Sequence, residues 1–152
     1  MYPTLIFLHS LTRWLVVGSL LYVLFRAGRG YVSKKLFSGR DGAARTLAVT
    51  AAHLQLVIGM TLYGQSPLVR QFWGHFREAW QDRTLVFFGL AHMLLMLTAV
   101  VLLTIGSALS KRKQEDRQKF KTMLAWFGIA LLVLFIAIPW PFSPFANRPY
   151  FR

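Results

Sequence analysis

Hydrophobic residues in this chain occur in long blocks that no charged residue interrupts. Four stretches lack Asp, Glu, Lys and Arg altogether: residues 4–12, 46–66, 84–110 and 122–147. Three of them exceed the length of about 18 residues at which an apolar segment indicates a membrane span. A chain of 152 residues has too little interior to bury so much apolar surface in water. The pattern therefore predicts helices that cross a lipid bilayer.

Turn residues mark where the predicted helices end. Gly28 and Gly30 follow the first predicted span, Pro67 follows the second, and Pro139 stops the fourth. The predicted spans are residues 3–25, 43–64, 84–106 and 123–138. Helices are expected because lipid leaves the backbone groups of an open strand without partners. The predicted fold is an all-α membrane protein, a four-transmembrane-helix bundle that forms one domain over residues 1–152.

The segment between the second and third predicted spans has a different pattern. Its large apolar residues recur at helical spacing with polar residues between them: Val69, Phe72, Trp73, Phe76 and Trp80. This pattern is typical of a short amphipathic helix that lies in the headgroup layer of a membrane. We therefore expect a short interfacial helix between spans 2 and 3.

Positive charge is concentrated in two of the connections between the predicted spans. The chain has 18 Lys and Arg residues against five Asp and Glu, a net charge of +13. Six cations lie in residues 26–45 and six in residues 107–122. Cytoplasmic loops carry such an excess, and nucleic-acid binding does not explain this distribution. We expect a multi-pass protein of a bacterial inner membrane, with these two loops cytoplasmic against the lipid bilayer and both termini outside (N-out/C-out).

Four ionisable residues lie inside the predicted spans: His9, Arg13, His53 and His92. Such residues are costly in lipid, so each requires a reason. The spans contain no Asp or Glu. Arg13 is therefore expected to meet backbone carbonyls, Gln55, Asp82 or water, or else an anionic group of a cofactor such as a haem propionate.

The three histidines of the spans fall at similar predicted depths. Counted from the outer end of each helix, His53 lies roughly 15 Å, His92 roughly 12 Å and His9 roughly 10 Å deep. Two facing imidazoles in an apolar bundle are what a b-type haem requires as axial ligands. His53 and His92 match best in depth and are the preferred iron ligands, with His9 beside Arg13 near the cofactor edge. The pair His9 and His92 is the alternative, and hydrogen bonding of each histidine between helices is the simpler explanation.

Small and flexible residues near these histidines suit a flat inserted group. Gly89 lies one turn from His92 and would let a ring approach the helix backbone. Met60 and Met96 lie within two turns of histidines on similar faces. The half of each span nearer the basic loops has no histidine. The sequence therefore predicts one haem b and not two.

Several of these residues follow one order along the chain: Leu8-His9-Ser10-Leu11-Thr12-Arg13-Trp14, His53-Leu54-Gln55-Leu56, Ala91-His92 and Ile138-Pro139-Trp140-Pro141. In this order and spacing the chain resembles small four-helix membrane proteins of Bacteroidetes-type bacteria that are labelled cytochrome b. The resemblance covers nearly the whole chain. It implies haem b and a respiratory membrane.

These observations lead to two functional hypotheses. The first is a membrane-embedded b-type cytochrome subunit that exchanges electrons with a quinone or a partner redox protein. The alternative is a cofactor-free accessory subunit of a larger membrane complex. The sequence has no phosphate-binding glycine loop and no HExxH motif. An electron-transfer or accessory subunit is therefore favoured over an enzyme that acts alone.

Overall fold

The computed structural model of the protein describes residues 1–142, and no strand occurs among them. Four helical segments are long and apolar enough to cross a membrane. They are α1 (Tyr2–Val32), α2 (Gly39–Gln65), the continuous segment Arg83–Arg112 and α7 (Asp116–Ala137). The chain is therefore an all-α, multi-pass membrane protein, as the hydropathy pattern predicts. The remainder of the predicted domain, residues 143–152, lies outside the described residues.

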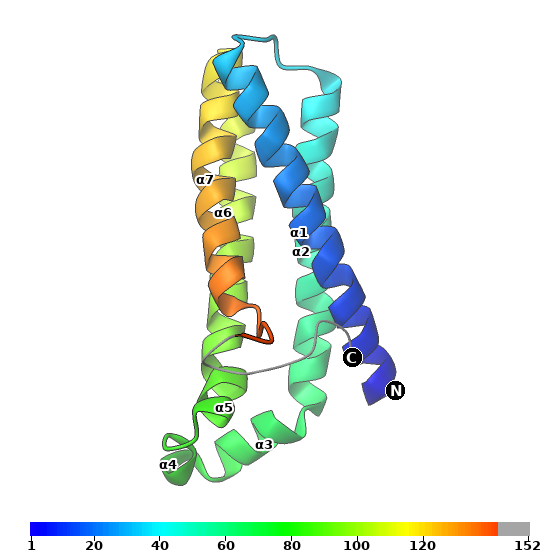
Figure 1. Ribbon diagram of the computed structural model, residues 1–152, viewed down its shortest axis with the longest axis vertical. Coiled ribbons are helices and arrows are strands. Elements are labelled where there is room, and N and C mark those ends of the chain that lie inside the picture. The colour runs from blue at the N-terminus through cyan, green and yellow to red at the C-terminus, as the bar shows by residue number, and fades with distance from the viewer. Residues whose placement is uncertain (143–152) are drawn as a thin grey trace.

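The four long segments form a bundle (Figure 1) in which α1 packs along α2, and α6 (His92–Arg112) packs along α7. The α1–α2 and α6–α7 connections lie at the same end, at the top of Figure 1. We call it the basic end because it carries Lys34 and Lys113. The opposite end, which we call the capped end, carries the short helices α3 (Pro67–Gly74), α4 (Phe76–Ala79) and α5 (Arg83–Val86).

The helices at the basic end are longer than the apolar blocks that predict them. The first helix continues through Arg26 to Val32, because charged side chains are tolerated outside the apolar layer. Ser38 and Asp41 form a capping box at the start of α2. The Asp41 carboxylate also lies 2.8 Å from Arg26 Nε. This ion pair ties the end of α1 to the beginning of α2.

The interfacial segment predicted between the second and third spans is helical, but it is broken at His75. Gly74, a weak helix former, ends α3, and α4 begins after His75 (φ −128°, ψ 50°). Val69 and Phe72 are buried, whereas Trp73 is exposed. The predicted apolar face is therefore divided between contacts with the bundle and the protein surface.

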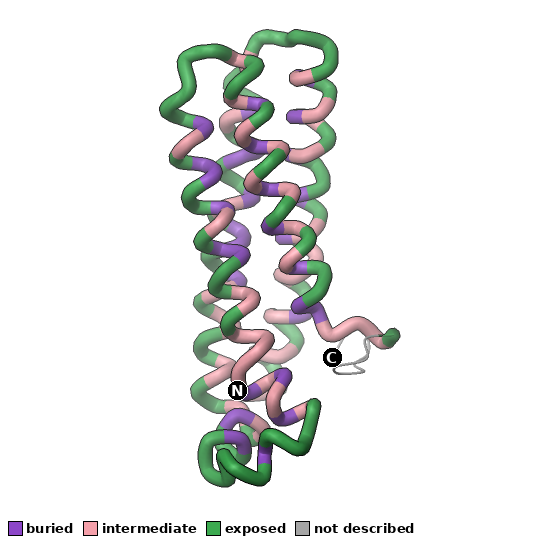
Figure 2. Tube along the Cα trace, turned by 90° about the vertical axis from the view of Figure 1, so that its left-hand side faces the viewer, coloured by how far each residue is buried: buried purple, intermediate pink, exposed green. Residues whose placement is uncertain are grey.

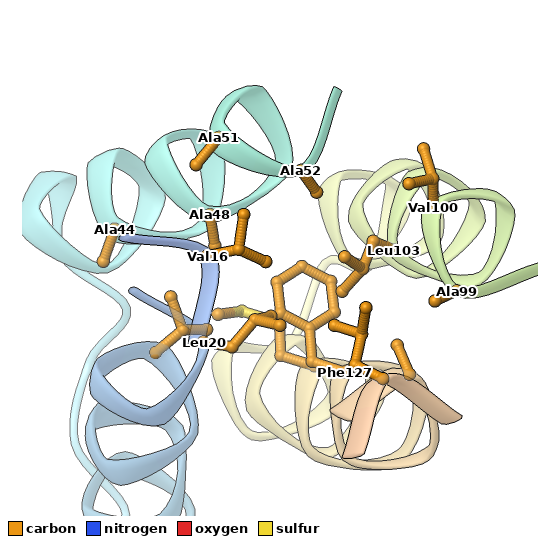
Figure 3. Close-up of a cluster of buried hydrophobic side chains, with 14 of the residues drawn as sticks. Val16, Leu20, Ala44, Ala48, Ala51, Ala52, Ala99, Val100, Leu103 and Phe127 are labelled. Carbon is orange, nitrogen blue, oxygen red and sulfur yellow. The ribbon is translucent and has the colours of Figure 1, made fainter. Parts of the chain in front are cut away.

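The main hydrophobic core lies between the four long helices (Figure 3). Its buried residues include Val16, Leu20, Ala48, Leu103 and Phe127. The α2 helix contributes only alanines to the buried set, and such small residues let membrane helices approach closely. Exposed positions cover the outward faces of the helices (Figure 2) and include large apolar side chains such as Leu21 and Leu132, which suit contact with lipid.

The contact between α6 and α7 depends on Gly106. A Cβ atom at this position would collide with the Cβ atom of Trp126 on α7. Changing Gly106 to Ala should therefore force the two helices apart and lower the free energy of unfolding by about 1–3 kcal/mol, the usual cost of overpacking. The thermal unfolding midpoint in detergent micelles measures this loss.

Gly128→Ala is the matched control for this prediction. Within residues 1–142, no neighbouring atom lies within 4 Å of a Cβ atom at Gly128, which is on α7, whereas Gly106 is on α6. Both changes replace a glycine inside a helix, so both gain similar helix propensity. Equal unfolding midpoints for the Gly106 and Gly128 variants would contradict the packing argument.

Candidate functional site

A cavity of about 200 Å³ lies between the helices on the capped-end side of the hydrophobic core. Five buried core residues, at least one from each long segment, also form part of its wall: Val16, Ala52, Val100, Leu103 and Leu134. From α3, Val69 contributes to the wall toward the capped end. Close packing therefore stops near the middle of the bundle, and an internal space replaces it toward α3.

The wall of this cavity is mainly apolar, with a few polar groups. The polar side chains include His9, Arg13, Gln55, Tyr63 and His92. Three methionines also line it: Met60, Met93 and Met96. An apolar cavity with few convergent polar groups is typical of a site for a small molecule or cofactor. Met60 and Met96 lie on this wall, as their predicted faces indicate.

His9 of α1 and His92 of α6 approach each other across the cavity. Their ring centres are 6.3 Å apart, and the ring planes meet at 69°. Nδ1 of His92 lies 2.8 Å from the carbonyl oxygen of Ala137. A carbonyl oxygen can only accept, so Nδ1 carries the proton and donates to it. Nε2 of His92 then has the free lone pair.

A π-helical turn, η1 (Phe87–Ala91), directly precedes His92. The backbone N–H of His92 donates to the carbonyl of Phe87, five residues earlier, instead of four as in an α-helix. The extra residue rotates His92 by about 100° relative to an uninterrupted α-helix. The direction of the His92 side chain therefore depends on this local distortion, which hydropathy does not reveal.

His9 packs against α2 at Gly59. A Cβ atom at Gly59 would lie 3.1 Å from Cε1 and 3.6 Å from Nδ1 of His9, so the glycine makes room for the ring. Nδ1 of His9 is buried and has no hydrogen-bond partner within residues 1–142. Burying a polar atom without a partner costs about 1–3 kcal/mol. A bound group that engages the His9 ring would offset this cost.

Gln55 fixes α1 to α2 beside this histidine. Its amide nitrogen donates to the carbonyl oxygen of His9 over 2.9 Å, and its oxygen accepts from the Thr12 hydroxyl. Gln55 therefore joins α2 to α1 through Thr12 and the backbone of His9. Arg13 lies one turn after His9, on the same helix face, and lines the cavity. Asp82 accepts hydrogen bonds from backbone N–H groups at the start of α5.

His53 lies elsewhere. Its ring is exposed on the surface of the bundle, with Nδ1 2.8 Å from the carbonyl of Val49 and Nε2 3.3 Å from the hydroxyl of Thr104. It is not one of the described residues that line the cavity. The structure thus brings His9 and His92 together and does not bring the preferred pair, His53 and His92, to the cavity. Depth along a helix gives the height of a side chain but not its direction around the axis.

Gly89 was expected to make room for a flat inserted group, but a side chain of the protein packs against it. Phe72 of α3 occupies the space that a Cβ atom at Gly89 would fill. The missing side chain therefore admits an aromatic ring of the protein itself. Gly59, which makes the corresponding space for His9, borders the cavity.

Comparison of the chain with models of known protein families, with curated proteins and with solved structures finds no match. Within the part of the chain that the structure describes, no three His, Asp or Glu side chains form a group that could hold a metal ion. The functional argument therefore begins from the geometry of the cavity and its pair of histidines.

The hydrogen bonds of Gln55 predict a coupled loss of stability. Gln55→Leu should lower the free energy of unfolding by about 1–3 kcal/mol, because it removes two partly buried hydrogen bonds that join α1 to α2, each worth about 0.5–1.5 kcal/mol. The Thr12 hydroxyl keeps the carbonyl of Leu8 as an acceptor in this variant. Thr12→Val should cost less, and the double variant less than the sum of the two. Thermal unfolding of the three variants in detergent measures the coupling. Additive losses would show that Thr12 and Gln55 do not interact.

Proposed function

We propose that the chain is a membrane-embedded b-type cytochrome subunit that binds one haem b between His9 and His92. The supporting observation is the distance of 6.3 Å between the two ring centres. A metal–imidazole bond is about 2 Å long and the nitrogen lies roughly 1 Å from the ring centre, so two imidazoles on opposite sides of one metal ion have centres about 6 Å apart. The separation of the two ring centres is therefore close to the one that binding of a single iron by both imidazoles would require.

The surroundings of the two histidines support the same assignment. An imidazole that binds a metal usually donates its other ring N–H to a carbonyl or carboxylate, as His92 does to Ala137. Gln55 holds the backbone of His9, and Gly59 leaves space for its ring. A bound haem supplies reversible one-electron chemistry at its iron. The protein contributes the orientation of the two imidazoles and the apolar side chains around the site.

The size of the cavity requires some of its wall to move. Its volume of about 200 Å³ is below the roughly 300–1,000 Å³ of pockets for drug-sized ligands. Met60, Met93 and Met96 belong to the wall, and methionine side chains adapt to irregular spaces with little cost. Repacking of these methionines is the adjustment that the chain offers to a macrocycle.

The distribution of Lys and Arg supports a position in a bacterial inner membrane with the basic end toward the cytoplasm. Both connections with an excess of Lys and Arg meet at the basic end, which agrees with a cytoplasmic position for that end. The site then lies in the outer half of a bacterial inner membrane, and both termini are outside. A single haem in one half of the bilayer does not carry electrons from one face to the other. The subunit therefore works with a quinone or a partner redox protein.

The decisive test is a spectrum of the purified protein and its histidine variants. Wild-type protein should contain one haem per chain, with the reduced-minus-oxidised α band of a bis-histidine b-type site. His9→Ala and His92→Ala should each lose this spectrum, because each removes one axial ligand. Absorption spectroscopy together with haem quantification measures both effects.

His53→Ala is the matched control for these variants. It removes an imidazole from the same membrane region, but from the surface of the bundle. Haem content and spectrum should therefore match wild type. Colourless wild-type protein that is stable only with neighbouring subunits would favour the alternative, a cofactor-free accessory subunit. Loss of haem in the His53 variant alone would favour His53 as a ligand.

Arg13 should tune the site electrostatically. Arg13 lines the cavity, so its positive charge would lie close to a bound cofactor. A positive charge near the iron favours the reduced form, which carries one positive charge less. Arg13→Gln should therefore lower the midpoint potential by an amount on the order of tens of millivolts. Potentiometric titration measures the shift, and Arg13→Lys, which keeps the charge, should reverse most of it.

A further inference from the structure

A chain of two hydrogen bonds joins the capped end of the bundle to the π-helical turn. The hydroxyl of Tyr63, near the end of α2, donates to the carbonyl oxygen of Gly89 in η1 over 2.7 Å. The same hydroxyl accepts a hydrogen bond from Trp73 Nε1 on α3 over 2.9 Å. One phenol therefore connects three elements: α2, α3 and η1.

The partner of Tyr63 in η1 lies within the turn that directs His92. In this turn the N–H of His92 donates to the carbonyl of Phe87. A π-turn is rare and local, so its persistence depends on contacts that an ordinary α-helix would not make. Tyr63 supplies one such contact at Gly89, and Phe72 packs where a side chain of residue 89 would lie.

We propose that Tyr63 is a positioning residue for His92: its hydroxyl holds η1 in the π conformation that turns the His92 imidazole toward His9. This inference rests on the proposed function for its consequence at the iron. The structural step, from Tyr63 through Gly89 to His92, stands on the described contacts alone. Tyr63 lines the cavity beside the histidines, but its role is exerted through the backbone of η1.

Trp73 connects the Tyr63 hydroxyl to the surface of the protein. Its ring is half exposed and stacks on Phe76, with ring centres 5.7 Å apart and planes at 12°. Its indole N–H reaches inward to Tyr63. The stacked aromatic residues Trp73 and Phe76 are therefore connected to η1 through the hydroxyl of Tyr63.

The test compares full-length wild type with Tyr63→Phe, which removes only the hydroxyl. Hydrogen–deuterium exchange of the amides in residues 87–92, measured on protein without cofactor, should be about fivefold faster in the variant, as expected for the loss of one hydrogen bond. In the haem-loaded protein, carbon monoxide should bind the reduced form about fivefold faster. The reason is that carbon monoxide binds after an axial histidine has left, and His92 is held less firmly in the variant.

Tyr31→Phe is the matched control. Tyr31 is on α1 near the basic end, and the structure shows no hydrogen bond from its hydroxyl within residues 1–142. Neither exchange in residues 87–92 nor carbon monoxide binding should change in this variant. Trp73→Phe keeps the aromatic ring but removes the N–H bond to Tyr63, and should shift both measurements in the same direction by less than Tyr63→Phe.

The outcomes separate this inference from the proposed function. Wild-type protein that binds no haem overturns the function, and amide exchange in residues 87–92 still decides the role of Tyr63. Wild-type protein with a bis-histidine spectrum whose Tyr63 and Trp73 variants match it in exchange and in carbon monoxide binding overturns the positioning role alone. If Tyr63→Phe fails to fold, Trp73→Phe answers the same question.

Discussion

Lipid offers no hydrogen-bond partners, and this constraint organises the whole bundle. Exposed threonines of the spans satisfy their hydroxyls within their own helix, as Thr61 does at the carbonyl of Val57 and Thr98 at that of Leu94. His53 meets the same requirement at a helix seam. Other polar side chains of the spans lie in the interior: His9, Gln55 and His92 on the capped-end side of the core, and Arg45 with Ser110 toward the basic end. Their interior positions follow from the cost of exposing a polar side chain to lipid without a hydrogen-bond partner.

The helices pack closely in the half of the bundle near the basic end and surround a cavity in the other half. Toward the basic end, alanines of α2 and glycines such as Gly106 bring the helices into close contact. Toward α3, larger residues and two histidines hold the helices around a space. The close-packed half fixes the separation of the helices, and the ring of Phe72 at Gly89 fixes η1 at the other end. The cavity therefore lies between two regions of close packing, the core on one side and the contact of Phe72 with Gly89 on the other.

The architecture was predictable from the sequence because charge-free blocks report directly on the bilayer. The four spans, the two basic connections and the interfacial segment all follow from composition and period. The helix ends at the basic end do not: α1, the Arg83–Arg112 segment and α7 extend six or seven residues beyond the predicted spans. The site was predictable only in part. His9, Arg13 and His92 line the cavity, but His53 does not, since similar depth on two helices does not make two side chains face each other. The rotation that η1 gives to His92 leaves no trace in hydropathy, and Tyr63 could not be distinguished from an ordinary interfacial aromatic residue.

The short connections at the basic end divide the protein into two helical hairpins, α1–α2 and α6–α7. His9, Gln55 and Gly59 belong to the first hairpin, while His92 and its acceptor Ala137 belong to the second. Neither hairpin contains a complete site. Any molecule that binds across the cavity therefore adds its binding free energy to the association of the hairpins. Removal of such a molecule would weaken the association of the two hairpins by the same amount.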